Sequence, residues 1–208
     1  MHRFWRLCLA LLAVYAAACD DDPTAPTPDP TSDLEGRPTV YYAGALDQTI
    51  WRLDPDATVP VSLRTEPGSS PVGIAVDPVS RTIFWNDQIS ESIRRCKLDG
   101  SEQVALAPVV ESIRGLAVDV SAGKVYWSDY VADKIQRANL DGTGVEGVVT
   151  EGLDTPWTIA FEAERRMLYW MDTSAGKFQR WPVSGGPVED VLSGLTGRER
   201  SMTFGPDS

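Results

Sequence analysis

Three aspartates in this chain are each followed, eight residues later, by an arginine. The pairs are Asp87 and Arg95, Asp129 and Arg137, and Asp172 and Arg180. A guanidinium offers a carboxylate two parallel donors, which makes this pair a strong one when the two groups meet. If each pair lies on two strands of one hairpin, the side chains can approach one another. The spacing therefore predicts a recurring structural ion pair, and no residue of the chain is predicted to be catalytic.

Acidic residues also end several short strand-like runs, at Asp77, Asp119 and Glu162. Ca²⁺ requires several oxygen ligands. One interpretation is therefore that these residues form a ring of carboxylates that binds calcium. The other is that these carboxylates accept hydrogen bonds from turn amides, since the chain has no Asp-rich calcium loop. No other cofactor is expected.

Histidine occurs once, at His2, inside a segment that is expected to be removed. Without histidine, the familiar pairs of nucleophile and base lose their usual base. This favours a protein that is not an enzyme, although catalysis by carboxylates and a metal stays open.

Residues 1–18 combine a basic start, an apolar core and three alanines directly before Cys19. This pattern is typical of a secretory signal and is too short for a comfortable membrane span. It resembles a bacterial lipoprotein signal, which implies lipidation of Cys19, export across the inner membrane and anchoring at the bacterial cell envelope. The alternative is ordinary cleavage after Ala18, which leaves Cys19 unmodified.

Residues 19–37 are rich in Pro, Thr and Asp and are expected to form a tether, because so few apolar side chains cannot offset the entropy of ordering. The third cysteine, Cys96, occupies the same repeat position as Leu53, Ala138 and Trp181. That position is expected to be buried and apolar, so Cys96 is interpreted as a core thiol.

The formal net charge is -11 at pH 7, which argues against binding to nucleic acid or to an anionic lipid surface. Contact with a membrane is therefore expected only through the lipid anchor.

An internal repeat occupies residues 38–208. The aromatic pairs Phe84–Trp85, Tyr126–Trp127 and Tyr169–Trp170 follow one another at steps of 42 and 43 residues, and Tyr41–Tyr42 is a fainter copy. In one copy, the runs 115–119, 124–129, 134–140 and 147–152 are predicted strands separated by turn residues. Four short strands in a period of about 40 to 45 residues are typical of a β-propeller blade. The two aromatic side chains of a pair point to opposite faces of the strand, so both faces of the sheet must be buried. Blades stacked on either side would bury them.

Residues 84–87, 126–129 and 169–172 read FWND, YWSD and YWMD, and the first two are preceded by GIAVD and GLAVD. These motifs resemble the YWTD motif of low-density-lipoprotein-receptor class B repeats. The resemblance implies an all-β propeller with a binding surface at one end or at its channel.

The number of blades stays open. Members of that family usually form six blades, whereas about four periods are present here. The chain enters at a second-strand equivalent, residues 39–43, and ends after a first-strand equivalent, residues 201–204. These two ends can complete one blade of a closed four-bladed ring, or the chain is part of a six-bladed ring and self-associates.

The expected function is a non-catalytic, membrane-anchored, extracytoplasmic interaction module for a protein or glycan ligand. Tyr130 and Trp157 are candidate anchors in loops, with core packing as the alternative for Trp157. The competing hypothesis is a calcium-dependent propeller hydrolase or lyase, similar to gluconolactonase or streptogramin lyase. A partial gene product without an independent role is the third.

Overall fold

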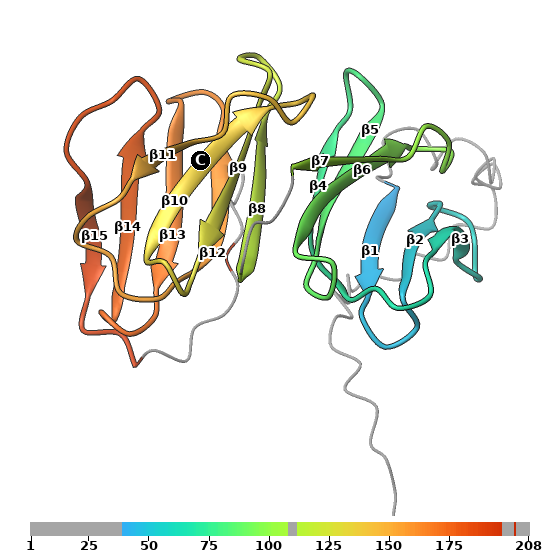
Figure 1. Ribbon diagram of the computed structural model, residues 1–208, viewed down its shortest axis with the longest axis horizontal. Helices are drawn as coiled ribbons and strands as arrows, with labels where there is room; N and C mark the ends of the chain where they lie inside the picture. The colour runs from blue at the N-terminus through green and yellow to red at the C-terminus, as the bar shows by residue number, and fades with distance from the viewer. Residues whose placement is uncertain (1–38, 108–111, 197–201, 203–208) are drawn as a thin grey trace, which may run out of the picture. The chain divides into compact units, whose positions relative to one another are not determined.

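The computed structural model describes residues 39–107, 112–196 and 202. Every regular element in these ranges is a β-strand, and the fifteen strands form four antiparallel sheets (Figure 1). In each sheet the strands are neighbours in chain order. The sheets are the blades expected from the repeat, and we number them blade 1 to blade 4. No helix in the described ranges has the length and apolar character needed to cross a membrane.

The strand bounds follow the repeat. Blade 1 contains β1 (Val40–Gly44), β2 (Thr49–Leu53) and β3 (Val61–Thr65). Blade 2 contains β4 (Pro71–Asp77), β5 (Thr82–Asp87), β6 (Ser92–Lys97) and β7 (Val104–Ala107). Blade 3 contains β8 (Ile113–Asp119), β9 (Lys124–Asp129), β10 (Lys134–Asn139) and β11 (Glu146–Val149). Blade 4 contains β12 (Pro156–Glu162), β13 (Met167–Asp172), β14 (Lys177–Pro182) and β15 (Glu189–Ser193). The four strands predicted for one copy are therefore confirmed as β8 to β11.

A four-residue turn joins the second and third strands of each blade. In blade 3, Asp129 pairs with Lys134 across residues 130–133. The fourth residue of this turn has a positive φ in all four blades, with values of 59° at Gln48, 48° at Glu91, 50° at Asp133 and 63° at Gly176. This left-handed residue lets the turn lead into the third strand in the same register each time.

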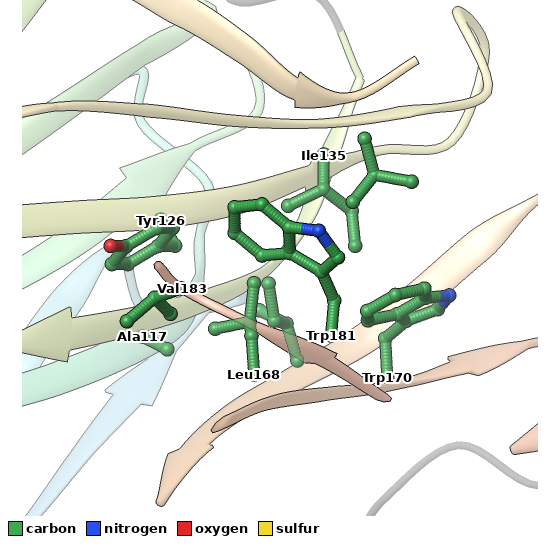
Figure 2. Packing of buried hydrophobic residues seen from close by; sticks show 9 residues of the cluster. Ala117, Tyr126, Ile135, Leu168, Trp170, Trp181 and Val183 are labelled. Carbon is green, nitrogen blue, oxygen red and sulfur yellow. The ribbon is translucent and has the colours of Figure 1, made fainter. Parts of the chain in front are cut away.

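The aromatic pair of each second strand is divided between two cores. Tyr126 packs in a cluster with Leu168 and Trp170 of blade 4, whereas its neighbour Trp127 packs with Phe84 and Ile93 of blade 2. Figure 2 shows the first of these clusters. Adjacent residues of a strand point to opposite faces. The prediction that blades cover both faces is thus confirmed.

The buried indole N–H groups of Trp170 and Trp127 donate hydrogen bonds to glutamine side chains. The indole nitrogen of Trp170 donates to Oε1 of Gln179 at 3.0 Å, and that of Trp127 donates to Oε1 of Gln136 at 3.2 Å. Each glutamine is the partner of its tryptophan in the neighbouring third strand. The cores therefore bury large aromatic area without leaving the indole N–H unpaired.

Glycine allows the first strands of successive blades to approach one another. A Cβ built on Gly115 of β8 would lie 2.5 Å from the backbone nitrogen of Ile159 in β12. A Cβ on Gly73 of β4 would lie 3.1 Å from the carbonyl oxygen of Arg114 in β8. Any larger residue at Gly115 would push β8 and β12 apart.

Blade 1 differs from the others in the exposure of its aromatic strand β1. Tyr42 and Val40 are exposed, whereas Trp85 and Ile83, which hold the same positions in blade 2, are fully buried. Blade 1 has no first strand within the described ranges. The segment predicted to supply it, residues 201–204, lies outside them except for Met202, so the prediction that the two chain ends share a blade stays a prediction.

We expect Trp127→Ala to lower the free energy of unfolding by about 3 to 5 kcal/mol, because it removes a fully buried indole between blades 2 and 3. Tyr42→Ala, at the same repeat position but exposed, should cost about 1 kcal/mol or less. Urea unfolding followed by circular dichroism measures both. Equal losses would contradict the role assigned to the packing between blades.

Candidate binding face

The aspartates that end the second strands bind backbone amides. Oδ1 of Asp87 accepts from the amides of Ser70 at 2.8 Å and Ile89 at 3.0 Å. Oδ1 of Asp129 accepts from the amide of Ala132 at 2.9 Å, and Oδ2 of Asp172 accepts from that of Asp154 at 2.8 Å. Each carboxylate thus holds the turn at its own end of the blade or the loop that enters the blade.

The predicted ion pairs of Asp87 with Arg95, Asp129 with Arg137 and Asp172 with Arg180 are not formed in the described chain, and the register explains why. Across the hairpins the arginines lie opposite Phe84, Tyr126 and Tyr169. The aspartates pair instead with Ser92, Lys134 and Lys177, the first residues of the third strands. Because a strand rises about 3.3 Å per residue, a separation of three residues puts the two groups about 10 Å apart.

Two of these arginines form ion pairs with other carboxylates. Arg137 pairs with Glu146 at 2.8 Å and Arg180 pairs with Glu189 at 2.7 Å, both on the fourth strand of the same blade. These pairs are partly exposed, so each contributes little to stability. The Nε atom of Arg95 is buried and has no hydrogen-bond partner.

The calcium candidates make turn contacts. Oδ1 of Asp77 accepts from the amides of Val79 and Ser80, and Oε1 of Glu162 accepts from the amide of Arg165. Within the described ranges, no three carboxylate, histidine or cysteine side chains converge as metal ligands would. The geometry supports the hydrogen-bonding interpretation of this set.

Asp119, the third calcium candidate, links two blades. Its carboxylate accepts a 2.6 Å bond from Arg166 of blade 4, which also donates to the Ser121 hydroxyl at 2.6 Å. Burial by itself would raise the pKa of Asp119, but the hydrogen bonds from Ser121 and Arg166 outweigh it and hold that pKa below its ordinary value.

Cys96 is a buried, free thiol in the core between blades 1 and 2. Burial raises its pKa to about 11, so the thiol stays protonated at neutral pH. This agrees with its interpretation as a core residue.

One end of the blades gathers the side chains best suited to contact another molecule. It is the end at which β4, β8 and β12 begin, and it includes the turns 45–48, 88–91, 130–133 and 173–176. Hydrogen bonds between blades join the sheets there, from Asn86 to the carbonyl of Ile113 at 3.0 Å and from the amide of Thr155 to Asp133 at 2.8 Å. We call this end the Arg114 face.

Arg114 contacts two aromatic rings on this face. Its guanidinium carbon is 4.5 Å from the centre of the Tyr130 ring and 4.8 Å from that of Trp157. The two ring centres are 5.6 Å apart, and Arg114 donates to the Tyr130 hydroxyl at 3.3 Å. All three residues are half-buried. The structure thus brings together the two candidate anchors named from the sequence, at the junction of blades 3 and 4. Tyr130 lies in a turn as expected, whereas Trp157 is the second residue of β12 and not a loop residue.

A polar cavity of about 260 Å³ lies beside this cluster, between blades 2 and 3. It is lined by backbone and side-chain atoms of Asn86, Asp87, Gln88, Glu91, Ser112, Ile113, Arg114 and Tyr130. A larger cavity of about 500 Å³ lies at blade 1, lined by residues that include Tyr41, Arg52, Val76 and Arg81. The larger cavity adjoins β1, which has no first-strand neighbour in the described ranges.

Sequence reasoning missed Arg114. It lies in β8 one residue before the glycine of GLAVD, and the same repeat position holds Val72 in blade 2 and Trp157 in blade 4. A position that changes from valine to arginine to tryptophan between copies is not constrained by the blade itself. That variation was the available signal.

Asp172 and Asp87 occupy the same repeat position, but their pKa values are shifted in opposite directions. Burial, together with the charges of Asp154 and Asp133, raises the pKa of Asp172, and one of its oxygens has no hydrogen-bond partner. Burial also acts to raise the pKa of Asp87, but bonds from the Ser90 hydroxyl and from backbone amides outweigh it and lower that pKa. The charge at Asp172 therefore costs stability at neutral pH, whereas the charge at Asp87 contributes to it.

We expect Asp172→Asn to raise the free energy of unfolding at neutral pH by on the order of 1 kcal/mol, because it removes a buried charge and keeps an acceptor for the Asp154 amide. Asp87→Asn should lower it by about 2 kcal/mol. Urea unfolding of each variant at a series of pH values from neutral to acid measures both changes in the free energy of unfolding.

The sign of each pH dependence follows from the pKa shift. The gain from Asp172→Asn should shrink as the pH falls through the raised pKa of Asp172, where the native carboxyl becomes protonated. The contribution of Asp87 is complete above its ordinary pKa and is lost as the pH falls through its lowered pKa. Two variants with the same effect at all pH values would contradict this assignment.

Comparison with solved structures finds the same architecture. The chain is similar to a nidogen chain in a crystal structure of a nidogen–laminin complex, with a TM-score of 0.71 and 28% identity, over 76% of this chain and 61% of that chain. It therefore spans less than two thirds of that neighbour. It is also similar in fold to streptogramin B lyase, with a TM-score of 0.61 and 14% identity, over 73% of this chain and 50% of the lyase chain.

Sequence comparison gives a shorter match. Mouse nidogen-2 is 37% identical over 68 residues, which are 32% of this chain and 5% of nidogen-2. No protein-family model matches the chain. With the repeated aromatic pair, the meander sheets and the nidogen likeness together, the described chain is a set of β-propeller blades of the YWTD type.

Proposed function

We propose that the chain is a non-catalytic binding module whose protein ligand docks on the Arg114 face. The observation that carries this proposal is the contact of the Arg114 guanidinium with the rings of both Tyr130 and Trp157. Arginine, tyrosine and tryptophan are the residue types that dominate binding energy in protein interfaces. A guanidinium that already contacts two rings also loses little further freedom when a ligand binds, which lowers the entropic cost of association.

The neighbouring structures support binding more than catalysis. The nidogen chain was crystallised with laminin, a protein partner, and it shares 28% of its aligned residues with this chain. The likeness to streptogramin B lyase is at 14% identity and concerns the fold alone. No histidine follows His2 in the sequence, so lyase or hydrolase chemistry on this chain has no imidazole base.

The same cluster stabilises the contact between blades 3 and 4, so binding and stability need separate measurement. The repeat supplies matched substitutions. Blade 2 carries Val72 where blade 3 has Arg114, and Gln88 where blade 3 has Tyr130. Arg114→Val and Tyr130→Gln therefore introduce residues that another blade already accommodates.

We also propose that the module is anchored at the bacterial cell envelope through a lipid on Cys19, with residues 19–37 as tether. The support is the pattern of residues 1–18, with three alanines directly before Cys19. A lipid-modified cysteine would place the blades at a membrane surface without a spanning segment.

For the binding module, phage-displayed peptides selected on the immobilised chain are the probe, and titration calorimetry measures their affinity. We expect Arg114→Val and Tyr130→Gln each to weaken the selected peptides by about tenfold, which corresponds to about 1.4 kcal/mol. Val79→Ser, in an exposed turn at the opposite end of the blades, is the control and should change nothing. Unchanged affinity in Arg114→Val and Tyr130→Gln variants that remain folded would refute the Arg114 face as the binding site.

For the anchor, we expect Cys19→Ala to move the chain from the membrane fraction to the soluble fraction of an expressing bacterium, with loss of labelling by a palmitate analogue. Cys8→Ala, inside the apolar core of the signal, is the control and should keep the label. A Cys19→Ala chain that still carries the label would refute lipidation at this residue.

A further inference from the structure

Exposed aliphatic side chains recur at one position of the turns on the Arg114 face. Leu46 is 93% exposed, Ile89 is 64% exposed and Val131 is 61% exposed, each as the second residue of its four-residue turn. Blade 4 has Ser174 at this position. We call Leu46, Ile89 and Val131 the aliphatic tips.

The fold does not require the aliphatic tips. Turn positions favour Gly, Asn, Asp and Ser, and Ser174 shows that the same turn forms with a polar residue. Single exposed apolar residues are ordinary on any surface. Three at equivalent positions of three neighbouring blades form an apolar arc on one face, and burial of that arc against a partner would be favourable.

Carboxylates surround the aliphatic tips. Asp47, Glu91 and Asp133 lie in the same turns, and Glu151 and Asp154 lie in the loop that leads into β12. None of these five carboxylates has a cation within 4 Å among the residues described.

The cations near the start of the third strands are already engaged, and Arg114 lies against the rings of Tyr130 and Trp157. Arg94 pairs with Glu66, and Lys177 pairs with Asp190 at 2.8 Å. Lys134 lies 3.9 Å from Asp129. The field of the five carboxylates is therefore not neutralised by these neighbours, and it favours a partner of positive charge.

The polar cavity on this face also has carboxylates close to the aliphatic tips. Asp87 and Glu91 of blade 2 form part of its lining, next in sequence to the tip at Ile89, and Arg114 and Tyr130 of blade 3 also line it. Its volume of about 260 Å³ is enough for one long side chain. A lysine or arginine of a partner can place its aliphatic stem against the apolar tips and its charge at these carboxylates.

We infer that the ligand of the Arg114 face is a basic protein segment, with apolar residues that cover Leu46, Ile89 and Val131 and with lysine or arginine side chains among the turn carboxylates. This inference names the chemistry of the partner and rests on the proposed function. It assigns to the aliphatic tips and the five carboxylates a specificity role that the blade fold does not give them.

The test uses three short fluorescein-labelled peptides in which leucine alternates with lysine, glutamate or serine. Fluorescence anisotropy with the full chain, at low and at high salt, gives their affinities. We expect the lysine peptide to bind at least about tenfold more tightly than the other two, and to weaken at high salt because the charges are exposed.

Two sets of variants locate the binding. Glu91→Gln with Glu151→Gln removes two exposed charges that make no hydrogen bond in the described chain, and Leu46→Ser, Ile89→Ser and Val131→Ser copy the residue that blade 4 already has. Each set should weaken the lysine peptide several-fold without loss of stability. Glu164→Gln and Val79→Ser, at the opposite end, are the matched controls and should leave it unchanged.

The outcomes separate this inference from the proposed function. Equal binding of the three peptides, or lysine-peptide binding that the charge and tip variants leave intact, overturns the inference. If peptides selected from the phage library depend on Arg114 and Tyr130 but are not basic, the proposed function holds and the inference fails. If the lysine peptide depends on the tips and carboxylates while Arg114→Val and Tyr130→Gln have no effect on it, the inference holds and the role of the aromatic cluster fails.

Discussion

Packing between blades is the interaction on which the rest of this structure depends. Each four-stranded sheet carries large apolar residues on both faces, as Tyr126 and Trp127 show, so a single blade cannot bury its own surface. The neighbouring blades bury it instead, and Gly73 and Gly115 let the first strands come close enough to do so. The exposure of Tyr42 in blade 1, at the position of the fully buried Trp85, shows what the same residue position becomes when no described blade covers it.

The Arg114 face follows from how these packed blades end. Asp87, Asp129 and Asp172 use their carboxylates to hold turns and loops at this end, which fixes the backbone and leaves the turn side chains free to vary. The positions of Arg114 and Tyr130 differ in residue type between the blades, whereas the aliphatic tips recur in three of the four turns. The fold therefore supplies a rigid frame, and the proposed binding residues are ones that the frame does not constrain.

Charge has different roles at the two ends of the blades. At the opposite end, Arg166 neutralises the buried Asp119 and joins blade 3 to blade 4. On the Arg114 face the guanidinium of Arg114 lies against aromatic rings, and five carboxylates of the turns and of the loop into β12 have no ion-pair partner among the residues described. Under the proposed function, the five carboxylates and the aliphatic tips contribute more to the selection and steering of a partner than to folding.

The sequence by itself determined the blades, because alternating strand residues, turn residues and a repeated aromatic pair are local signals that recur in four copies. It also indicated Cys96 as a core residue, and it named Tyr130 and Trp157 as candidate anchors, whose binding role stays a proposal. It could not determine which arginine meets which carboxylate, since a four-residue turn sets the register and moves Arg137 opposite Tyr126 instead of beside Asp129. Only the tertiary structure brought Arg114 and Tyr130 of one blade against Trp157 of the next, because contacts between blades join residues that no local pattern relates.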